Sequence, residues 1–151
     1  TTLFRSLMML GLETLSLRVR HEAEATAKLA EFFRANEHVK AVSYVGFEED
    51  ASCALAQKYF RKGAACVISV ELKGTLESTV RFVEGLKLVA NMTMIGDSIT
   101  VVTHPASTTH KQLSDEAKVK AGIAPTLLRI SAGLEAVEDI IEDFEQSFAQ
   151  I

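Results

Sequence analysis

The sequence predicts an α/β fold of the α+β type: a two-layer sandwich with a small mixed or antiparallel sheet, helices on one face, and a long helix preceding it. Two observations predict this class. A helical apolar pattern fills the first 35 residues, and short β-branched stretches then alternate with helix-length patterns. The 151 residues are enough for one domain with a sizeable core.

Residues 3–35 predict one long helix or two nearly continuous ones, because apolar residues recur at steps of three and four without an intervening proline. Gly11 is the weak point, costing about 1 kcal/mol relative to alanine. The pattern starts directly at Thr1, with no turn or strand before it. We therefore expect the chain to be a fragment of a longer protein.

The remaining elements follow from local patterns. Strands are predicted at residues 39–45, 66–72, 88–95, 99–103 and 127–131, and helices at 51–60, 75–86, 114–122 and 134–148. Thr75 and Ser114 are suitable N-cap residues. In the last strand, alternation places Leu128 and Ile130 on one face and Arg129 on the other.

Composition excludes several classes of function. The net charge of −4 and the absence of a basic stripe argue against binding to nucleic acid or to an anionic membrane. The apolar stretches are too short to span a bilayer. The two cysteines, Cys53 and Cys66, indicate neither a disulfide scaffold nor a zinc site, so we expect a reducing, cytoplasmic setting.

Arg129 is the strongest single candidate for function, because it stands alone in the apolar run 127–130. A half-buried guanidinium needs an anion or several acceptors, and its planar fork suits a carboxylate. A carboxylate ligand is one interpretation. An internal salt bridge to an aspartate or glutamate is the other, and on the residues alone it is slightly favoured.

The segment 96–110, GDSITVVTHPASTTH, brings histidines and hydroxyl groups together. We reject a metal site, because His104 and His110 lack a cysteine or carboxylate at ligand spacing. No Ser-His-Asp arrangement is evident, and the hydroxyl groups of 107–109 are better explained as hydrogen-bonding groups that shape the loop. No glycine-rich phosphate loop occurs, so the residues indicate no cofactor site.

Several motifs together resemble a known family. They are Gly11-Leu12-Glu13-Thr14-Leu15, His104-Pro105-Ala106-Ser107-Thr108-Thr109-His110, Gly122-Ile123, Leu128-Arg129-Ile130-Ser131 and Gly133-Leu134-Glu135. In order and spacing they resemble the C-terminal region of the pyridoxal-phosphate-dependent Cys/Met-metabolism enzymes, the cystathionine γ-synthase-like group. Gly96-Asp97 followed by the histidine-bounded motif is most similar to the O-acetylhomoserine sulfhydrylases of that family.

The resemblance implies the C-terminal domain of a fold-type I enzyme, usually a homotetramer. It implies that Arg129 clamps the α-carboxylate of an amino acid substrate, that Thr109 helps to hold this arginine, and that the backbone around Met94 and Gly96 lines the pocket. Met94 departs from the serine or asparagine common in relatives, and methionine cannot donate a hydrogen bond. His21-Glu22 replaces an Arg-His pair common in relatives, which we interpret as a surface change.

The resemblance also implies what lies elsewhere. The lysine that binds pyridoxal 5'-phosphate belongs to an N-terminal domain upstream of this chain, because no lysine here has the Ser/Thr-Lys setting of the relatives. We therefore expect residues 1–35 to form an interdomain helix and residues 36–151 a substrate-side domain. No catalytic, cofactor-binding or metal-binding residue is expected in the chain, and the fragment alone should be inactive.

The implied reaction of the full-length protein is a γ-replacement that makes homocysteine from O-acetylhomoserine and sulfide, in methionine biosynthesis. Two alternatives stay open. One is a methionine γ-lyase or a cystathionine γ-synthase or lyase, which would use the same carboxylate clamp. The other is of a different class, a free-standing α/β module that binds an amino acid through Arg129.

Overall fold

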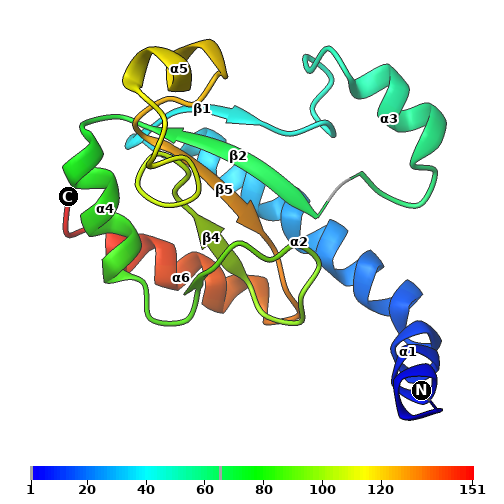
Figure 1. Ribbon diagram of the computed structural model, residues 1–151. Helices are drawn as coiled ribbons and strands as arrows, with labels where there is room; N and C mark the ends of the chain where they lie inside the picture. The colour runs from blue at the N-terminus through cyan, green and yellow to red at the C-terminus, as the bar shows by residue number, and fades with distance from the viewer. Residues whose placement is uncertain (1, 65) are drawn as a thin grey trace.

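The computed structural model describes residues 2–64 and 66–151 (Figure 1). Its elements are, in order, α1 (Thr2–Glu13), α2 (Leu15–Ala35), β1 (Val39–Ser43), α3 (Cys53–Tyr59), β2 (Val67–Leu72), α4 (Leu76–Gly85), β3 (Ala90–Asn91), β4 (Val101–Thr103), α5 (Asp115–Lys120), β5 (Leu127–Ser131) and α6 (Val137–Phe148).

The strands form one five-stranded sheet in the order β1-β2-β5-β4-β3. The pairs β1–β2, β2–β5 and β4–β5 are antiparallel, whereas β3 and β4 are parallel. Ile68 of β2 and Val102 of β4 both pair with Ile130, so β5 is the middle strand of the sheet. The prediction of a small mixed sheet is confirmed.

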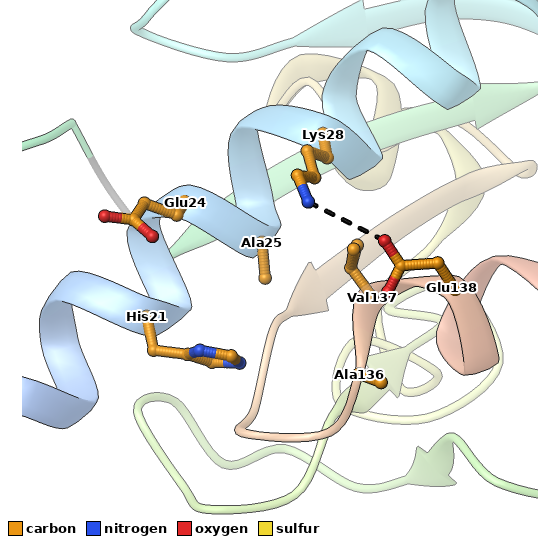
Figure 2. A pocket seen from close by; sticks show the side chains of 7 residues that line it. All are labelled: His21, Glu24, Ala25, Lys28, Ala136, Val137 and Glu138. Atoms are coloured by element: carbon orange, nitrogen blue, oxygen red, sulfur yellow. Dashed lines mark ion pairs between the residues drawn. The ribbon is translucent and has the colours of Figure 1, made fainter.

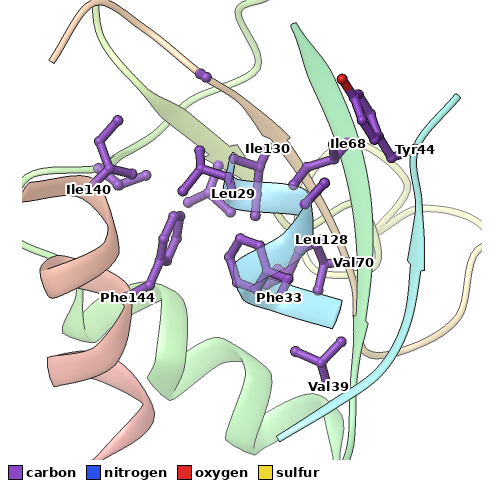
Figure 3. Packing of buried hydrophobic residues seen from close by; sticks show 14 of the residues in the cluster. Leu29, Phe33, Val39, Tyr44, Ile68, Val70, Leu128, Ile130, Ile140 and Phe144 are labelled. Carbon is purple, nitrogen blue, oxygen red and sulfur yellow. The ribbon is translucent and has the colours of Figure 1, made fainter. Parts of the chain in front are cut away.

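One face of the sheet carries the hydrophobic core (Figure 3). Leu128 and Ile130 of β5 are 0% and 1% exposed, and they pack in one cluster with Phe33 of α2 and Phe144 of α6. The α4 residues Phe82 and Val83 belong to the same cluster. Helices α2, α4 and α6 therefore form the second layer of the predicted sandwich.

The first helical stretch divides at Thr14 rather than at Gly11. Thr14 O accepts hydrogen bonds from the amides of Leu17 and Arg18, which starts α2 afresh. The guanidinium of Arg18 also donates to Gly11 O at 3.1 Å, so the last turn of α1 is held by a side chain of α2. Figure 1 shows α1 projecting beyond the sheet. A Cβ added to Gly11 would meet no atom within 4 Å.

The predicted strand at 88–95 was wrong beyond Ala90–Asn91. The amide of Met92, directly after β3, still donates to Val102 O of β4, but before β3 and beyond Met92 side chains hold the backbone groups. The amides of Leu88 and Val89 donate to the carboxylate of Asp143, and Thr93 O accepts from Arg129. The observed helix ends differ from the predicted ones by a few residues. The predicted N-caps at Thr75 and Ser114 are confirmed, because both side chains accept a hydrogen bond from a backbone amide of the first helical turn.

Asp143 joins α6 to the chain that enters β3. Its carboxylate is buried and accepts hydrogen bonds from the amides of Lys87, Leu88 and Val89 at 2.8, 2.9 and 2.9 Å. Hydrogen bonds to a charged group are stronger than neutral ones. This carboxylate therefore fixes where the short edge strand begins.

His104 holds the connection between β4 and β5. Its ring is 1% exposed, with Nε2 2.7 Å from Pro125 O and Nδ1 2.8 Å from Ser107 Oγ. A carbonyl oxygen only accepts, so Nε2 carries the proton and Nδ1 accepts from the serine hydroxyl. Burial lowers the pKa of His104, partly opposed by the hydrogen bond to Pro125, so the ring is neutral near pH 7.

Replacing the Asp143 carboxylate should destabilise the fold. Asp143→Ala leaves three backbone donors without their acceptor, and we expect a loss of about 2–4 kcal/mol in the free energy of unfolding. Urea denaturation measures it. Glu142→Ala, at an exposed neighbouring position, is the control and should change stability by less than about 0.5 kcal/mol. Equal losses for the two variants would contradict the role of Asp143.

The free energy of unfolding should decrease as the pH is lowered, because His104 becomes protonated. Since the folded state lowers the pKa of this group, its contribution is fully present above the unfolded pKa of about 6.5 and decreases as pH falls below it. We expect the urea midpoint to drop between pH 7 and pH 5, and His104→Asn to reduce that drop. His110→Asn should keep it; if His110→Asn behaves like His104→Asn, the assignment is wrong.

Candidate functional site

The pleat of β5 places Arg129 on the face of the sheet that is turned away from the helices. Its neighbours Leu128 and Ile130 are buried under the helix layer, and Arg129 itself is half-buried. In the sheet register Arg129 lies between Ser69 of β2 and Thr103 of β4. The alternation predicted from the sequence is therefore confirmed by burial.

Arg129 is bound to the backbone that follows β3. Its Nη2 donates to Thr93 O at 2.8 Å and, more weakly, to Thr103 Oγ1 at 3.4 Å. The hydroxyl of Thr103 in turn donates to Met92 O. These contacts hold one end of the guanidinium against the segment 92–96, and they fix the direction in which its remaining donors point.

No carboxylate lies within ion-pair distance of Arg129 among the described residues. Glu71 shares this face of the sheet, but its carboxylate is 2.7 Å from Lys40 Nζ. The N–H groups on Nη1 and Nε of Arg129 have no hydrogen-bond partner within 2–64 and 66–151. The internal salt bridge considered above is not observed there, and the guanidinium has donors open to an external anion.

Met94 and Gly96 lie in the segment that contacts Arg129. Met94 is 49% exposed, and its thioether supplies no donor. Gly96 adopts φ +69°, a left-handed conformation that favours glycine, and its amide donates to Ser131 Oγ at 3.1 Å. The structure thus brings Met94 and Gly96 to the same side of β5 as Arg129.

Thr109 lies elsewhere in the loop. It is exposed, its hydroxyl is 2.8 Å from His110 Nδ1, and no hydrogen bond joins it to Arg129 in the described part of the chain. The hydroxyl that bonds Arg129 belongs to Thr103, which sequence reasoning missed. Thr103 ends β4 directly opposite Arg129 in an antiparallel pair, and the sequence alone does not show which strands pair.

A second hydrogen-bond network, centred on Thr100, fixes the chain just before β4. The carboxylate of Glu135 accepts from the amide and the hydroxyl of Thr100, and Thr100 Oγ1 accepts from the amide of Gly133. A Cβ on Gly133 would lie 2.3 Å from the carbonyl carbon of Ile99 and 2.5 Å from Thr100 N. Only glycine permits this approach, so the Gly133-Leu134-Glu135 motif is explained by packing.

The interpretation of His21-Glu22 as a surface change is wrong for Glu22. Glu22 is 1% exposed and is therefore no surface change. Burial raises the pKa of its carboxyl, Arg18 and His21 oppose the rise, and Asp97 adds to it. His21 is exposed, with Nε2 3.3 Å from Glu135 O.

A cavity of about 300 Å³ lies between α2 and the start of α6 (Figure 2). It is lined by His21, Glu24, Ala25, Lys28, Ala136, Val137 and Glu138. Lys28 Nζ lies 3.7 Å from a carboxylate oxygen of Glu138, both side chains are mostly exposed, and Glu24 adds a second carboxylate to the lining. The cavity belongs to the helix layer and receives no group from the Arg129 face.

The described residues offer neither a metal site nor a membrane-spanning helix. They contain no group of three or more His, Cys, Asp or Glu side chains placed to hold a metal ion. No helix among them is long and apolar enough to cross a membrane.

The chain is similar to characterised proteins along nearly its whole length. It is 42% identical over 141 residues to a sulfhydrylase from Fusarium oxysporum f. sp. lycopersici, and 40% identical over 142 residues to O-acetyl-L-homoserine sulfhydrylase 1 of Thermus thermophilus. These alignments cover 93% and 94% of this chain but 33% and 34% of the relatives. The chain thus spans about a third of the length of the curated relatives it matches.

Solved structures agree with the fold. A putative O-acetylhomoserine (thiol)-lyase from Campylobacter jejuni, which carries a pyridoxyl-lysine group, matches with a TM-score of 0.87 at 35% identity, over 95% of this chain and 34% of that one. A cystathionine γ-lyase from Micromonospora echinospora matches with a TM-score of 0.85 at 32% identity, over 92% of this chain and 36% of that one.

The family model for Cys/Met metabolism PLP-dependent enzymes matches residues 4–149, which include every element from the body of α1 to the end of α6. The same span holds Arg129, the segment 92–96 and the loop that contains His104. This chain belongs to the Cys/Met-metabolism family of pyridoxal-phosphate-dependent enzymes.

Proposed function

We propose that the chain is the substrate-side domain of an O-acetylhomoserine sulfhydrylase and that Arg129 binds the α-carboxylate of its substrate. The observation that carries the proposal is the half-buried guanidinium of Arg129, whose Nη1 and Nε donors have no partner among the described residues. A carboxylate supplies both the charge and the acceptors that these donors lack. The names of the curated relatives support the choice of reaction.

The proposed reaction is a γ-replacement. O-acetylhomoserine loses acetate from its γ-carbon, hydrosulfide adds to that carbon, and homocysteine is released. Pyridoxal phosphate, when bound, supplies the electron sink for carbanionic steps in this family. The contribution of this chain is to hold the carboxylate, and thereby to orient the Cα–H bond relative to a base elsewhere in the protein.

The lysines of this chain do not fit the role of the cofactor amine. Lys118, the least exposed of those with ion pairs, lies 3.2 Å from Asp115 in α5, and the other lysines are exposed. The cofactor would therefore be held by residues outside this chain, and we propose that the 151-residue chain alone has no activity.

We further propose that residues 1–35 form an interdomain helical segment, broken at Thr14, and that residues 36–151 form the substrate-side domain, in whose core the second helix α2 packs. The surface of α1 supports this, because Leu3, Phe4, Leu7 and Leu10 are each more than 60% exposed. Apolar side chains in such number on one helix usually pack against another surface. A preceding cofactor-binding domain would cover them. A cytoplasmic homotetramer is the proposed form of the full-length protein.

A cystathionine γ-lyase or methionine γ-lyase activity is the second candidate, favoured by the likeness to the cystathionine γ-lyase structure. The reaction products distinguish the sulfhydrylase from the γ-lyase. The full-length protein given O-acetylhomoserine and sulfide should release homocysteine and acetate. A γ-lyase instead eliminates a thiol from its substrate and releases ammonia and a 2-oxo acid.

The carboxylate role predicts a specific kinetic defect. In the full-length protein, Arg129→Lys replaces the planar fork by a single ammonium and should raise KM for the amino acid substrate by about 10- to 100-fold, which corresponds to the loss of one charge-assisted hydrogen bond. The visible absorbance of the bound cofactor should stay unchanged. Steady-state kinetics and absorbance spectra measure the two effects.

The matched control is Arg81→Lys, because Arg81 is exposed on α4 and lies outside the site. It should leave KM unchanged. If Arg129→Lys changes neither KM nor kcat, the carboxylate assignment is wrong.

A further inference from the structure

The segment from Thr93 to Gly96 is tied at both ends to one face of β5. Arg129 Nη2 donates to Thr93 O at 2.8 Å, and Gly96 N donates to Ser131 Oγ at 3.1 Å. Side chains at alternate positions of a strand share a face, so both anchors reach the segment from the same side of the sheet. Between these anchors, Met94 and Ile95 have no backbone hydrogen bond to another described residue.

Ser131 is built into the sheet at this point. It is 2% exposed, although it lies on the face turned away from the helices, and it pairs with Val67 of β2 and Val101 of β4. Burial and the charge of Glu22 raise the pKa of the Cys66 thiol, and the hydroxyl of Ser131 opposes this rise. Neighbours on both sides therefore restrict where Ser131 Oγ can lie.

The backbone at Gly96 is shaped to meet that hydroxyl. Gly96 donates its amide N–H to Ser131 Oγ with a φ of +69°, a conformation that a residue with a Cβ adopts only at a cost. A serine oxygen at the end of β5 and a left-handed glycine in the facing loop thus form one contact. Without the hydroxyl, the amide of Gly96 loses its acceptor, and Arg129 is the one side chain of β5 among the described residues that still holds the segment.

We propose that Ser131 is a positioning residue for the carboxylate site, which holds the Met94–Ile95 backbone beside the open donors of Arg129. The inference rests on the proposed function, and it adds a residue to which no role was assigned above. Because Met94 and Ile95 have no polar side chain, their backbone amides are the only donors that these two residues offer to a carboxylate. Their position depends on the anchor at Gly96.

The test uses the full-length pyridoxal-phosphate protein and Ser131→Ala. Loss of one hydrogen bond should speed deuterium exchange in a peptide covering residues 92–99 by roughly two- to tenfold, measured by mass spectrometry. KM for the amino acid substrate should rise by a similar factor, while kcat changes less than about twofold. Ser131→Thr keeps the hydroxyl and should restore both values.

Ser147→Ala is the matched control. Ser147 is also fully buried and donates its hydroxyl to a backbone carbonyl, that of Phe82, but it lies in the helix layer. It should lower the melting temperature without altering exchange at 92–99 or KM. If Ser131→Ala and Ser147→Ala change KM and exchange alike, or if Ser131→Ala changes neither, the inference is overturned.

Failure of the proposed function would look different. Faster exchange at 92–99 in Ser131→Ala, together with an unchanged KM in Arg129→Lys, would leave the anchor in place and remove the carboxylate from the site. An unchanged exchange rate in Ser131→Ala, together with a raised KM in Arg129→Lys, would keep the carboxylate site and refute the role of Ser131.

Discussion

The alternation of side chains along β5 is the constraint on which this molecule depends. Leu128 and Ile130 must enter the helix layer, where both are almost fully buried, and this forces Arg129 and Ser131 to the opposite face. A shift of one residue in register would bury a guanidinium among phenylalanines. The same interactions that hold the sheet to its helices therefore also direct the candidate site away from them.

Arg129 is only partly satisfied by its own chain. Its Nη2 is bound to Thr93 O and Thr103 Oγ1, whereas Nη1 and Nε have no partner among the described residues. Partial coordination of this kind restrains the side chain before a ligand arrives and leaves donors for the ligand. A guanidinium that is already oriented loses less conformational entropy when it binds an anion.

The loops around the arginine are held by contacts that cross long stretches of sequence. Asp143 of α6 fixes the entry to β3, Glu135 fixes Thr100 before β4, and His104 fixes the turn after it. Each contact joins a side chain to a backbone group of a distant segment. The site is therefore a property of the whole domain, although the ligand would meet only a few of its residues.

Sequence periodicity was sufficient for most of the fold. The two clearest alternating runs became β2 and β5, and the caps at Thr75 and Ser114 were found from local chemistry alone. The strand at 88–95 was overestimated, because apolar composition does not reveal that Asp143 and Arg129 take its backbone groups. These hydrogen bonds join residues that are far apart in the sequence, whereas strand propensity reflects only the local sequence.

The candidate site was predicted in part. Arg129 stood out as a charge within an apolar strand, and the resemblance to relatives directed attention to Met94 and Gly96. Thr103 and Ser131 were missed because their roles depend on which strand and loop lie beside β5. The role of Thr109 stays a prediction, since its hydroxyl here bonds His110.

The most direct test is a crystal structure of the full-length pyridoxal-phosphate protein with a bound amino acid that cannot react at its γ-carbon. The carboxylate should lie within about 2.7–2.9 Å of donors on Arg129, with Nη2 still bound to Thr93 O. A carboxylate bound away from Arg129, or an Arg129 that pairs with an acidic side chain of the protein, would contradict the account.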